Sequence, residues 1–362
     1  MEASDLRLSE QSGASNTEIR ARACPNCYLC GSKGEPLYED LTDRLFGAPG
    51  KWSLSRCPNR GCGLAWLNPM PLESDIARAY ANYFTHEDFT PPRRPVNLGL
   101  VRRTWRWMKT AYLAEEFGCG EIAPGMRRKL ACLAVKMLPP FREQLEAPYR
   151  YLPRQKKGRV LDVGCGNGEM LQVAQRMGWD AEGVEVDPQA VAAAKKRGLR
   201  VHQGSLAEQN FADDSFDLIL MNHVIEHVHD PLGLLRECYR VLRPGCLLVV
   251  WTPNLDSWGH RQFGPSWRGL EPPRHLYLFN RKNLVDLAQR AGFIEPRVTS
   301  TVRPTVGIFL ESPRIRSSGR GDPNRAPNFA ELTRAYSAAF AEAALRLFDP
   351  FAGDELLLEA RK

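Results

Sequence analysis

From residue 159 onward, short apolar runs alternate with segments of helical periodicity. A short apolar run between turn residues is typical of a buried strand, and apolar residues at every third or fourth position indicate a helix that packs on one face. Strands that alternate with helices predict an α/β fold with a doubly wound parallel sheet. The predicted strands are 159–163, 181–186, 199–203, 216–222 and 246–252, and the helices include 170–177, 189–197 and 231–242.

The first apolar run leads into a glycine-rich turn with the sequence VLDVGCGNGE, residues 160–169. Glycine has no Cβ atom, so the backbone can adopt positive φ and lie directly against a ligand. The helix that follows offers free N–H groups to polar ligand atoms. Glu185 ends the second strand, where a carboxylate can accept hydrogen bonds from both ribose hydroxyls of an adenosyl group. Because these glycines recur at every second residue, unlike GxGxxG, we do not expect a dinucleotide.

The N-terminal part of the chain contains two cysteine pairs, each followed by a glycine. The glycine lets the backbone curl its N–H groups toward the sulfurs, and two such pairs supply a tetrahedral four-thiolate zinc site. We favour Cys27, Cys30, Cys57 and Cys62 as ligands, with Cys24 as the alternative to Cys27. The competing interpretation is a set of reduced, buried thiols.

The domain organisation follows from composition. Residues 1–22 are polar, which predicts a disordered leader, and 23–71 form the zinc-ribbon-like module, with short strands at 37–41 and 52–56. A helical connector occupies 72–155, with apolar positions at helical spacing between 130 and 138, and the α/β core occupies 156–302.

The C-terminal part contains an insertion, 303–353, before a final strand in 354–362. Residues 303–328 are rich in Pro, Arg and Ser and predict a loop or lid. Residues 329–347 predict an amphipathic helix that covers the sheet or the substrate mouth, with membrane contact as the alternative. Its apolar positions are Phe329, Leu332, Tyr336, Phe340, Ala343 and Leu347.

Charge is concentrated at the N-terminal side. The chain has a net charge of +7, and residues 1–159 hold 25 basic against 17 acidic side chains. Such a flank could meet nucleic acid, an anionic membrane surface or an acidic substrate. For the basic, Trp-containing stretch 91–110 we prefer a helix with a solvated basic face. No apolar run approaches about 18 residues, and the polar N-terminus is unlike a secretory signal, so we expect a cytoplasmic protein with reduced cysteines.

Five separated segments together resemble class I S-adenosylmethionine-dependent methyltransferases. They are VLDVGCGNGEML, GVEVDP, FADDSFDLILMNHVIEHVHDP, RVLRPGCLLVVWTPN and PRHLYLF, and they cover about 160–302. The resemblance implies a Rossmann-like sheet of seven strands, with a sixth near 297–302 and an antiparallel seventh at 355–360. The cysteine pairs with the LNPMP turn, residues 67–71, resemble the N-terminal module of bacterial members that modify polysaccharides or secondary metabolites.

The resemblance also implies where the cofactor binds. Gly164, Cys165, Gly166 and Gly168 would line its methionine moiety, Asp162 would orient that turn, and Glu185 would hold the ribose. Asn222 and His223 would close the pocket. Ser205 and Leu206 stand where the family often has an Asp that contacts the adenine amine, so adenine recognition is expected to use backbone groups and apolar packing.

The segment HVIEH and a later histidine are the candidates for the reacting site. On a helix, His223, Glu226 and His227 share one face, and together they could hold a second divalent ion. Ubiquinone-pathway O-methyltransferases and small-RNA 2′-O-methyltransferases are similar here, with an ExxEH segment that binds such an ion, but His223 replaces the first acid. His275 is the other candidate for a base.

We therefore expect a methyltransferase that acts on a small-molecule acceptor, with a sugar, glycan or secondary-metabolite hydroxyl favoured over carbon or nitrogen. The first alternative is an RNA methyltransferase whose zinc ribbon and basic flank bind the phosphate backbone. The second is a zinc scaffold that binds the cofactor without transferring its methyl group. Peripheral membrane contact is compatible with the sequence, and the sequence gives no indication of the oligomeric state.

Overall fold

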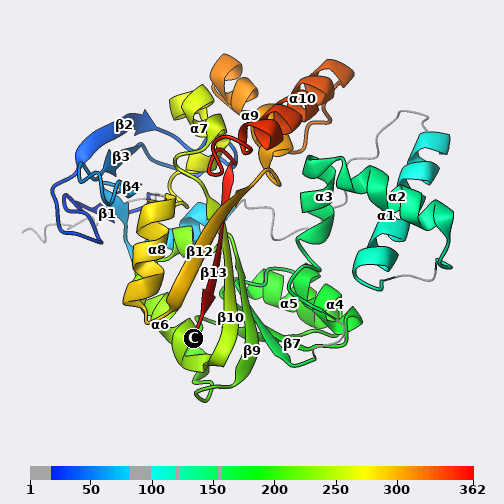
Figure 1. The fold of residues 1–362 in the computed structure, drawn as a ribbon. Helices are drawn as coiled ribbons and strands as arrows, with labels where there is room; N and C mark the ends of the chain where they lie inside the picture. The colour runs from blue at the N-terminus through cyan, green and yellow to red at the C-terminus, as the bar shows by residue number, and fades with distance from the viewer. Residues whose placement is uncertain (1–17, 82–98, 120–121, 154–156) are drawn as a thin grey trace, which may run out of the picture.

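The computed structural model describes residues 18–81, 99–119, 122–153 and 157–362, and at its centre is a seven-stranded sheet (Figure 1). The strand order is β12-β13-β10-β9-β6-β7-β8, and only β13 runs antiparallel to its neighbours. This confirms the predicted Rossmann-like fold. The strands are β6 (Arg159–Val163), β7 (Asp180–Glu185), β8 (Arg200–Gln203), β9 (Phe216–Asn222), β10 (Leu242–Pro253), β12 (Ile294–Thr301) and β13 (Glu355–Arg361).

Helices cover both faces of this sheet. Figure 1 shows α4 (Glu169–Arg176) and α5 (Pro188–Lys196) on one side and α6 (Pro231–Val241) and α8 (Arg281–Arg290) on the other. Local sequence fixes where these helices start. Asp187 caps α5 through the N–H of Gln189, and Asn280 with Asn283 forms a capping box at α8.

The N-terminal module shares a sheet with the core. Its strands β2 (Glu35–Leu41), β3 (Trp52–Arg56) and β4 (Ala65–Leu67) are extended by β11 (Tyr277–Leu278), in the order β11-β4-β3-β2. One continuous group of buried apolar side chains runs from Trp52 and Leu64 in the module to Ile219 and Val250 in the central sheet. The module therefore packs on the core, and the core supplies β11, the edge strand of the module's sheet.

The expected leader is ordered at its end. β1 (Ala21–Arg22) pairs with β5 (Met70–Pro71), and Ile19 is buried. The guanidinium of Arg20 also bonds to the buried Asp75 in η1 (Glu73–Tyr80), with an Nε to Oδ2 distance of 2.8 Å. These contacts contradict a disordered state for the last residues of 1–22, while 1–17 lie outside the described residues.

The described part of the connector forms three helices, namely α1 (Gly99–Glu116), α2 (Met126–Lys136) and α3 (Pro139–Glu146). Phe141 of α3 joins them to the C-terminal insertion, because its ring stacks on Tyr336 at 5.0 Å and meets Trp105 of α1 at 5.0 Å. A helix with Trp105 at an interface agrees with the preferred interpretation of 91–110. Arg93 and Arg94 lie outside the described residues. Among the helices described, none is long and apolar enough to cross a membrane.

The insertion contains a helix where we expected a loop. α9 (Thr305–Ser318) includes Pro313 and ends at Gly319, which has a left-handed backbone. Tertiary packing outweighs the unfavourable composition here, since Phe309 stacks on Trp258 at 4.9 Å and meets Phe263 at 5.0 Å. Both partners belong to α7 (Trp258–Phe263), and the short turns η5 (Gly264–Ser266) and η6 (Arg268–Leu270) follow it.

The helix predicted at 329–347 is α10 (Phe329–Leu345), but a different face of it is buried. Ala335, Ala338, Ala339 and Glu342 are its buried residues, whereas Phe329 is 85% exposed and Leu347, beyond the helix, is 80% exposed. Small side chains let α10 approach α9 closely, whereas Tyr336 of the predicted face is half-buried and stacks on Phe141 of α3.

A pair of carboxyl groups is buried where α10 meets the start of β13. Glu342 and Asp354 are both inaccessible to solvent. Burial raises the pKa of both groups, and the charge of Asp354 raises the pKa of Glu342 further. Hydrogen bonds from Ser257 (2.7 Å) and Trp267 (3.2 Å) to Oδ1 of Asp354 oppose the rise in the Asp354 pKa.

This buried pair should make stability depend on pH. A carboxyl with a raised folded-state pKa contributes stability that is complete below the usual carboxyl pKa of about 4 and is lost as pH rises through the folded-state value. We expect Glu342→Gln to flatten the loss of unfolding free energy between pH 5 and pH 9 by at least about 1.4 kcal/mol, the equivalent of one pKa unit. Chemical denaturation at both pH values measures this, with the exposed Glu39→Gln as control, and parallel curves for wild type and Glu342→Gln would contradict it.

Candidate active site at the carboxyl ends of the central strands

The glycine turn after β6 leaves one open position between two crowded ones. A Cβ atom on Gly164 would lie 2.3 Å from Val224 Cγ2, and one on Gly168 would lie 2.2 Å from Leu199 Cδ1. A Cβ on Gly166 would have no described atom within 4 Å. The outer glycines therefore serve close packing, whereas Gly166 faces free space that a ligand can occupy.

Glu185 is anchored to this turn by backbone donors. Its carboxylate accepts hydrogen bonds from the N–H groups of Gly166 and Asp187, both at 2.9 Å. Below the turn, Asp162 is buried, and this burial together with the charge of Glu185 raises its pKa to about 8. Cys165 is buried as well, with Sγ only 2.5 Å from where a Cβ on Gly183 would lie, which fits a space-filling role.

The other predicted cofactor residues lie at the ends of β8 and β9. Leu206 is buried and Ser205 is exposed. The Ser205 N–H donates to Glu208 Oε2 in η3 (Ala207–Gln209) at 2.6 Å. Asn222 is exposed, and its Oδ1 accepts a hydrogen bond from Arg303 Nη2 at 2.6 Å. All the predicted cofactor residues thus line the same edge of the sheet.

The segment HVIEH is not the helix that we expected. Only η4 (Ile225–His227) is helical, and His223 precedes it with a φ of +54°. His223 Nδ1 lies 3.1 Å from Glu226 Oε1, and Nε2 lies 2.8 Å from Glu355 Oε1. Burial opposes a charge on His223, but these two carboxylates raise its pKa to about 9. Both ring nitrogens are thus engaged, which leaves His223 unsuited to bind a metal ion.

His275 takes the place of His223 beside Glu226 and His227. One ligand atom from each of Glu226, His227 and His275 lies within 4.8 Å of the other two, and the two imidazole rings are 4.7 Å apart. Glu226 is inaccessible to solvent and accepts a hydrogen bond from Thr252 Oγ1 at 2.9 Å. Despite this burial, the hydrogen bond and charge of His223 lower the pKa of Glu226 to about 2.

Backbone carbonyls set the protonation of both histidines. Nδ1 of His227 lies 3.0 Å from the Arg274 carbonyl, and Nδ1 of His275 lies 2.8 Å from the Gly269 carbonyl. A carbonyl oxygen only accepts, so each Nδ1 carries the proton and each Nε2 keeps its lone pair. Burial lowers the pKa of both rings, that of His227 to about 4 with a contribution from His275. The cluster therefore offers two neutral bases and a carboxylate, the donor set of a 2-His-1-carboxylate metal centre.

This cluster adjoins the glycine turn. β6 and β9 are neighbours in the sheet, with Val163 paired to Met221, and Val224 contacts the backbone at Gly164. The open position at Gly166 and the histidine cluster therefore follow adjacent strands at the switch point where the order of an open α/β sheet reverses, which is the general location of ligand sites in such folds.

Sequence reasoning missed two residues that contact His223 and His227. Glu355 bonds to His223, Thr301 and Arg303, and Tyr80 OH lies 2.9 Å from His227 Nδ1. Glu355 lies next to an apolar run, as Glu185 does, so the sequence contained a pattern that could have identified Glu355 as a site residue. Tyr80 reaches the site from 147 residues away, and no local pattern reports such a contact.

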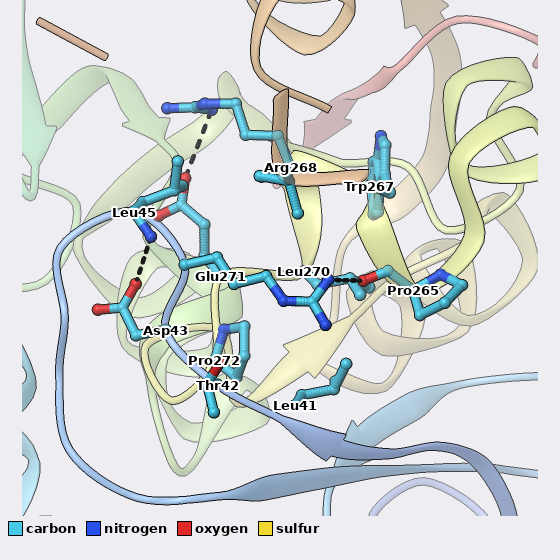
Figure 2. Close-up of a pocket in the computed structure, with 12 residues that line it drawn as sticks. Leu41, Thr42, Asp43, Leu45, Pro265, Trp267, Arg268, Leu270, Glu271 and Pro272 are labelled. Atoms are coloured by element: carbon cyan, nitrogen blue, oxygen red, sulfur yellow. Dashed lines mark hydrogen bonds and ion pairs between the residues drawn. The ribbon is translucent and has the colours of Figure 1, made fainter. Parts of the chain in front are cut away.

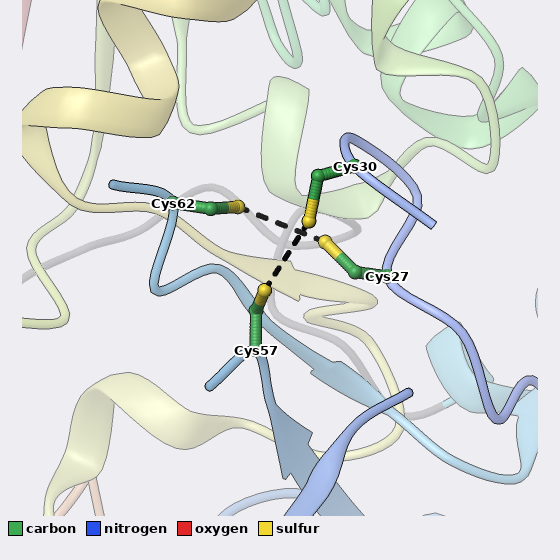
Figure 3. Close-up of side chains that lie close together, drawn as sticks. All are labelled: Cys27, Cys30, Cys57 and Cys62. Carbon is green, nitrogen blue, oxygen red and sulfur yellow. Dashed lines mark hydrogen bonds between the residues drawn. The ribbon is translucent and has the colours of Figure 1, made fainter. Parts of the chain in front are cut away.

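The four predicted cysteine ligands converge (Figure 3). The sulfurs of Cys27 and Cys62 are 3.7 Å apart and those of Cys30 and Cys57 are 3.4 Å apart, and all four are free thiols. Tetrahedral Zn–S bonds of about 2.3 Å place sulfurs about 3.8 Å from one another, so the donor set fits zinc. Cys24 is outside the cluster, where its N–H donates to Asn68 Oδ1 at 2.9 Å.

Comparison with known proteins identifies the central part of the chain. Residues 139–294 match a family model described as a methyltransferase domain. A relative from Mycolicibacterium smegmatis, named probable S-adenosylmethionine-dependent methyltransferase, is 34% identical over 167 residues, which are 45% of this chain and 60% of the relative. The ubiquinone biosynthesis O-methyltransferase of Cereibacter sphaeroides is 32% identical over 42% of this chain and 65% of that relative.

Among solved structures, a SAM-dependent methyltransferase from Archaeoglobus fulgidus aligns with a TM-score of 0.42 and 20% identity over 64% of this chain and 98% of that chain. The chain spans about 60% of the length of the curated relatives named first. The family match begins at α3, so the four-cysteine module lies outside it.

Because Gly166 faces open space and Gly168 is closely packed, alanine substitutions at the two positions should have different effects. Gly166→Ala adds a methyl group to open space, so we expect the fold to survive with a loss of about 1–2 kcal/mol from positive φ and S-adenosylmethionine affinity to fall at least about tenfold. Gly168→Ala drives its Cβ into Leu199 and should mainly lower the melting temperature. Calorimetric titration and thermal unfolding separate the two effects. Unchanged cofactor affinity in Gly166→Ala would contradict the assignment.

Proposed function

Because residues 139–294 form a class I S-adenosylmethionine-dependent methyltransferase domain, we propose that this protein methylates a hydroxyl group of a small molecule. One observation carries the proposal. Two neutral imidazoles, His227 and His275, stand with unprotonated Nε2 atoms beside Glu226, on the strand next to the glycine turn. The sequence resemblance of the N-terminal module leads us to favour a sugar, glycan or secondary metabolite as acceptor.

The chemistry of the bases supports oxygen as the accepting atom. When bound, S-adenosylmethionine supplies an electrophilic methyl group. A hydroxyl must lose its proton as it attacks, whereas a neutral amine already presents a lone pair. His275 Nε2 is therefore proposed to accept the hydroxyl proton, and Gly166 and Glu185 to hold the cofactor so that the acceptor is aligned with it.

The alternative role of the same three residues is to bind a divalent ion, in which case His275 Nε2 would ligate the ion in place of accepting the hydroxyl proton. Glu226, His227 and His275 replace the set with His223 expected from sequence, because both nitrogens of His223 face carboxylates. In metal sites, a ligating histidine usually donates its other ring N–H to a carbonyl or carboxylate, and His227 and His275 have that arrangement. An ion held there would polarise the acceptor hydroxyl.

Zinc in the four-cysteine cluster is proposed as a structural element. A four-thiolate site has no open coordination position, so it stabilises the fold and performs no chemistry. We expect Cys57→Ser to lose about one equivalent of zinc and to unfold at a lower temperature, while the matched Cys24→Ser keeps both properties. Elemental analysis and thermal unfolding measure this, and full zinc retention in Cys57→Ser would contradict the ligand set.

Turnover with methyl-labelled cofactor tests the function itself. Acceptor fractions from cell extract should yield a labelled small molecule that mass spectrometry identifies. His275→Ala should lower turnover at least about 10²-fold, the usual contribution of a general base, with cofactor affinity unchanged. His202→Ala, which removes a histidine bonded to Glu182 away from the site, is the control. Unchanged turnover in His275→Ala would contradict its role.

Three further outcomes separate the alternatives. Loss of turnover after chelation, with recovery on addition of one divalent ion, would assign Glu226, His227 and His275 to a metal rather than to proton transfer alone. Label in RNA, with binding that weakens steeply as salt rises, would replace the small-molecule acceptor. No labelled product with any fraction would favour a cofactor-binding scaffold.

A further inference from the structure

A fully buried arginine links the N-terminal module to the histidine cluster. Arg274 has no solvent exposure, and its Nη1 and Nη2 donate to the two carboxylate oxygens of Asp43 at 2.8 and 3.0 Å. Asp43 follows β2 and also accepts the N–H groups of Leu45, Phe46 and Ala48. The carboxylate is thus held in place by its own loop before it meets the arginine.

The loop of Asp43 faces the segment that precedes Arg274 across a nearly filled interface. Figure 2 shows Asp43 and Leu45 of this loop beside Arg268 and Glu271. Arg44 donates to the Pro265 carbonyl at 3.1 Å, and Arg268 pairs with Glu271 at 3.4 Å. The cavity between them has a volume of about 20 Å³, which is room for about one water molecule. Neither segment can shift freely without disturbing the other.

Arg274 touches two further elements that meet at one histidine. Its Nη1 donates to the Ala79 carbonyl at 3.0 Å, at the end of η1. The next residue, Tyr80, places its hydroxyl 2.9 Å from His227 Nδ1, and the carbonyl of Arg274 itself lies 3.0 Å from the same nitrogen. The side chain of Arg274 therefore fixes both groups that contact Nδ1.

We propose that Asp43, Arg274 and Tyr80 are positioning residues that hold His227 in the tautomer with the proton on Nδ1. This inference rests on the proposed function, since it explains how the Nε2 lone pair is kept facing Glu226 and His275. The N-terminal module thereby contributes to the reacting site by orienting His227, although none of the module's side chains is proposed to touch the acceptor.

The structure also supplies matched controls. Arg56 and Asp256 form a second ion pair between module and core, at 3.1 Å, but both side chains are more than 40% exposed. Tyr28 of the module bonds to Asp230 of the core through its hydroxyl, whereas the groups at His227 Nδ1 are the Tyr80 hydroxyl and the Arg274 carbonyl. Changes at Asp256 and Tyr28 remove contacts between module and core without altering the surroundings of His227.

The test compares Asp43→Asn with Asp256→Asn, and Tyr80→Phe with Tyr28→Phe, in the full-length protein. We expect Asp43→Asn to lower kcat at least about tenfold with little change in KM for the cofactor, and Tyr80→Phe to lower kcat less, about threefold. In protein labelled with ¹⁵N-histidine, the Nδ1 and Nε2 shifts of His227 should move toward mixed tautomers in Asp43→Asn and, to a smaller extent, in Tyr80→Phe. Both control variants should match wild type.

An unchanged His227 spectrum in folded Asp43→Asn would overturn the proposal, as would an equal loss of kcat in Asp256→Asn. If Asp43→Asn does not fold, Tyr80→Phe, which keeps the ion pair, decides through the same two measurements. The spectrum is recorded without substrate, so it can contradict the role of these positioning residues even when the protein shows turnover. Absence of turnover in wild type would instead reject the proposed function.

Discussion

The ion pair between Arg274 and Asp43 is the contact on which the arrangement of the active site depends. Taking a guanidinium and a carboxylate out of water costs several kcal/mol per ion, and only close pairing with additional hydrogen bonds offsets that cost. Here both oxygens of Asp43 are shared between Arg274 and backbone N–H groups. Removal of one partner would leave a buried charge, so the pair enforces a single placement of the chain around His227.

The four-cysteine module belongs to the same construction. Its strand β4 pairs with β11 of the core, and the carbonyl of Cys62 accepts hydrogen bonds from the side chains of Asn280 and Asn283, at 3.0 and 3.3 Å. The segment between Arg274 and Asn283 therefore runs from the reacting site to the cysteine cluster within ten residues. A loss of order in the module would reach the active site through this segment.

The sequence predicted the parts of the molecule that local pattern controls. Apolar runs placed five strands of the central sheet, the family resemblance placed the other two, and the glycine turn identified the edge where Glu185 lies. Paired cysteines with trailing glycines predicted a cluster that includes Cys27 and leaves out Cys24. The errors arose where tertiary contacts decide. Packing of Phe309 folds α9 despite Pro313, positive φ at His223 removes it from the expected helix, and Tyr80 and Asp43 reach the site from distant positions.

A crystal structure of the protein with S-adenosylhomocysteine tests the central claim most directly, namely that the glycine turn holds the donor beside the cluster of Glu226, His227 and His275. We predict that the ribose hydroxyls bond to Glu185, that the ligand lies against Gly166, and that its sulfur faces the cluster. A ligand bound elsewhere, or a sulfur that faces away from Glu226, His227 and His275, would contradict the account.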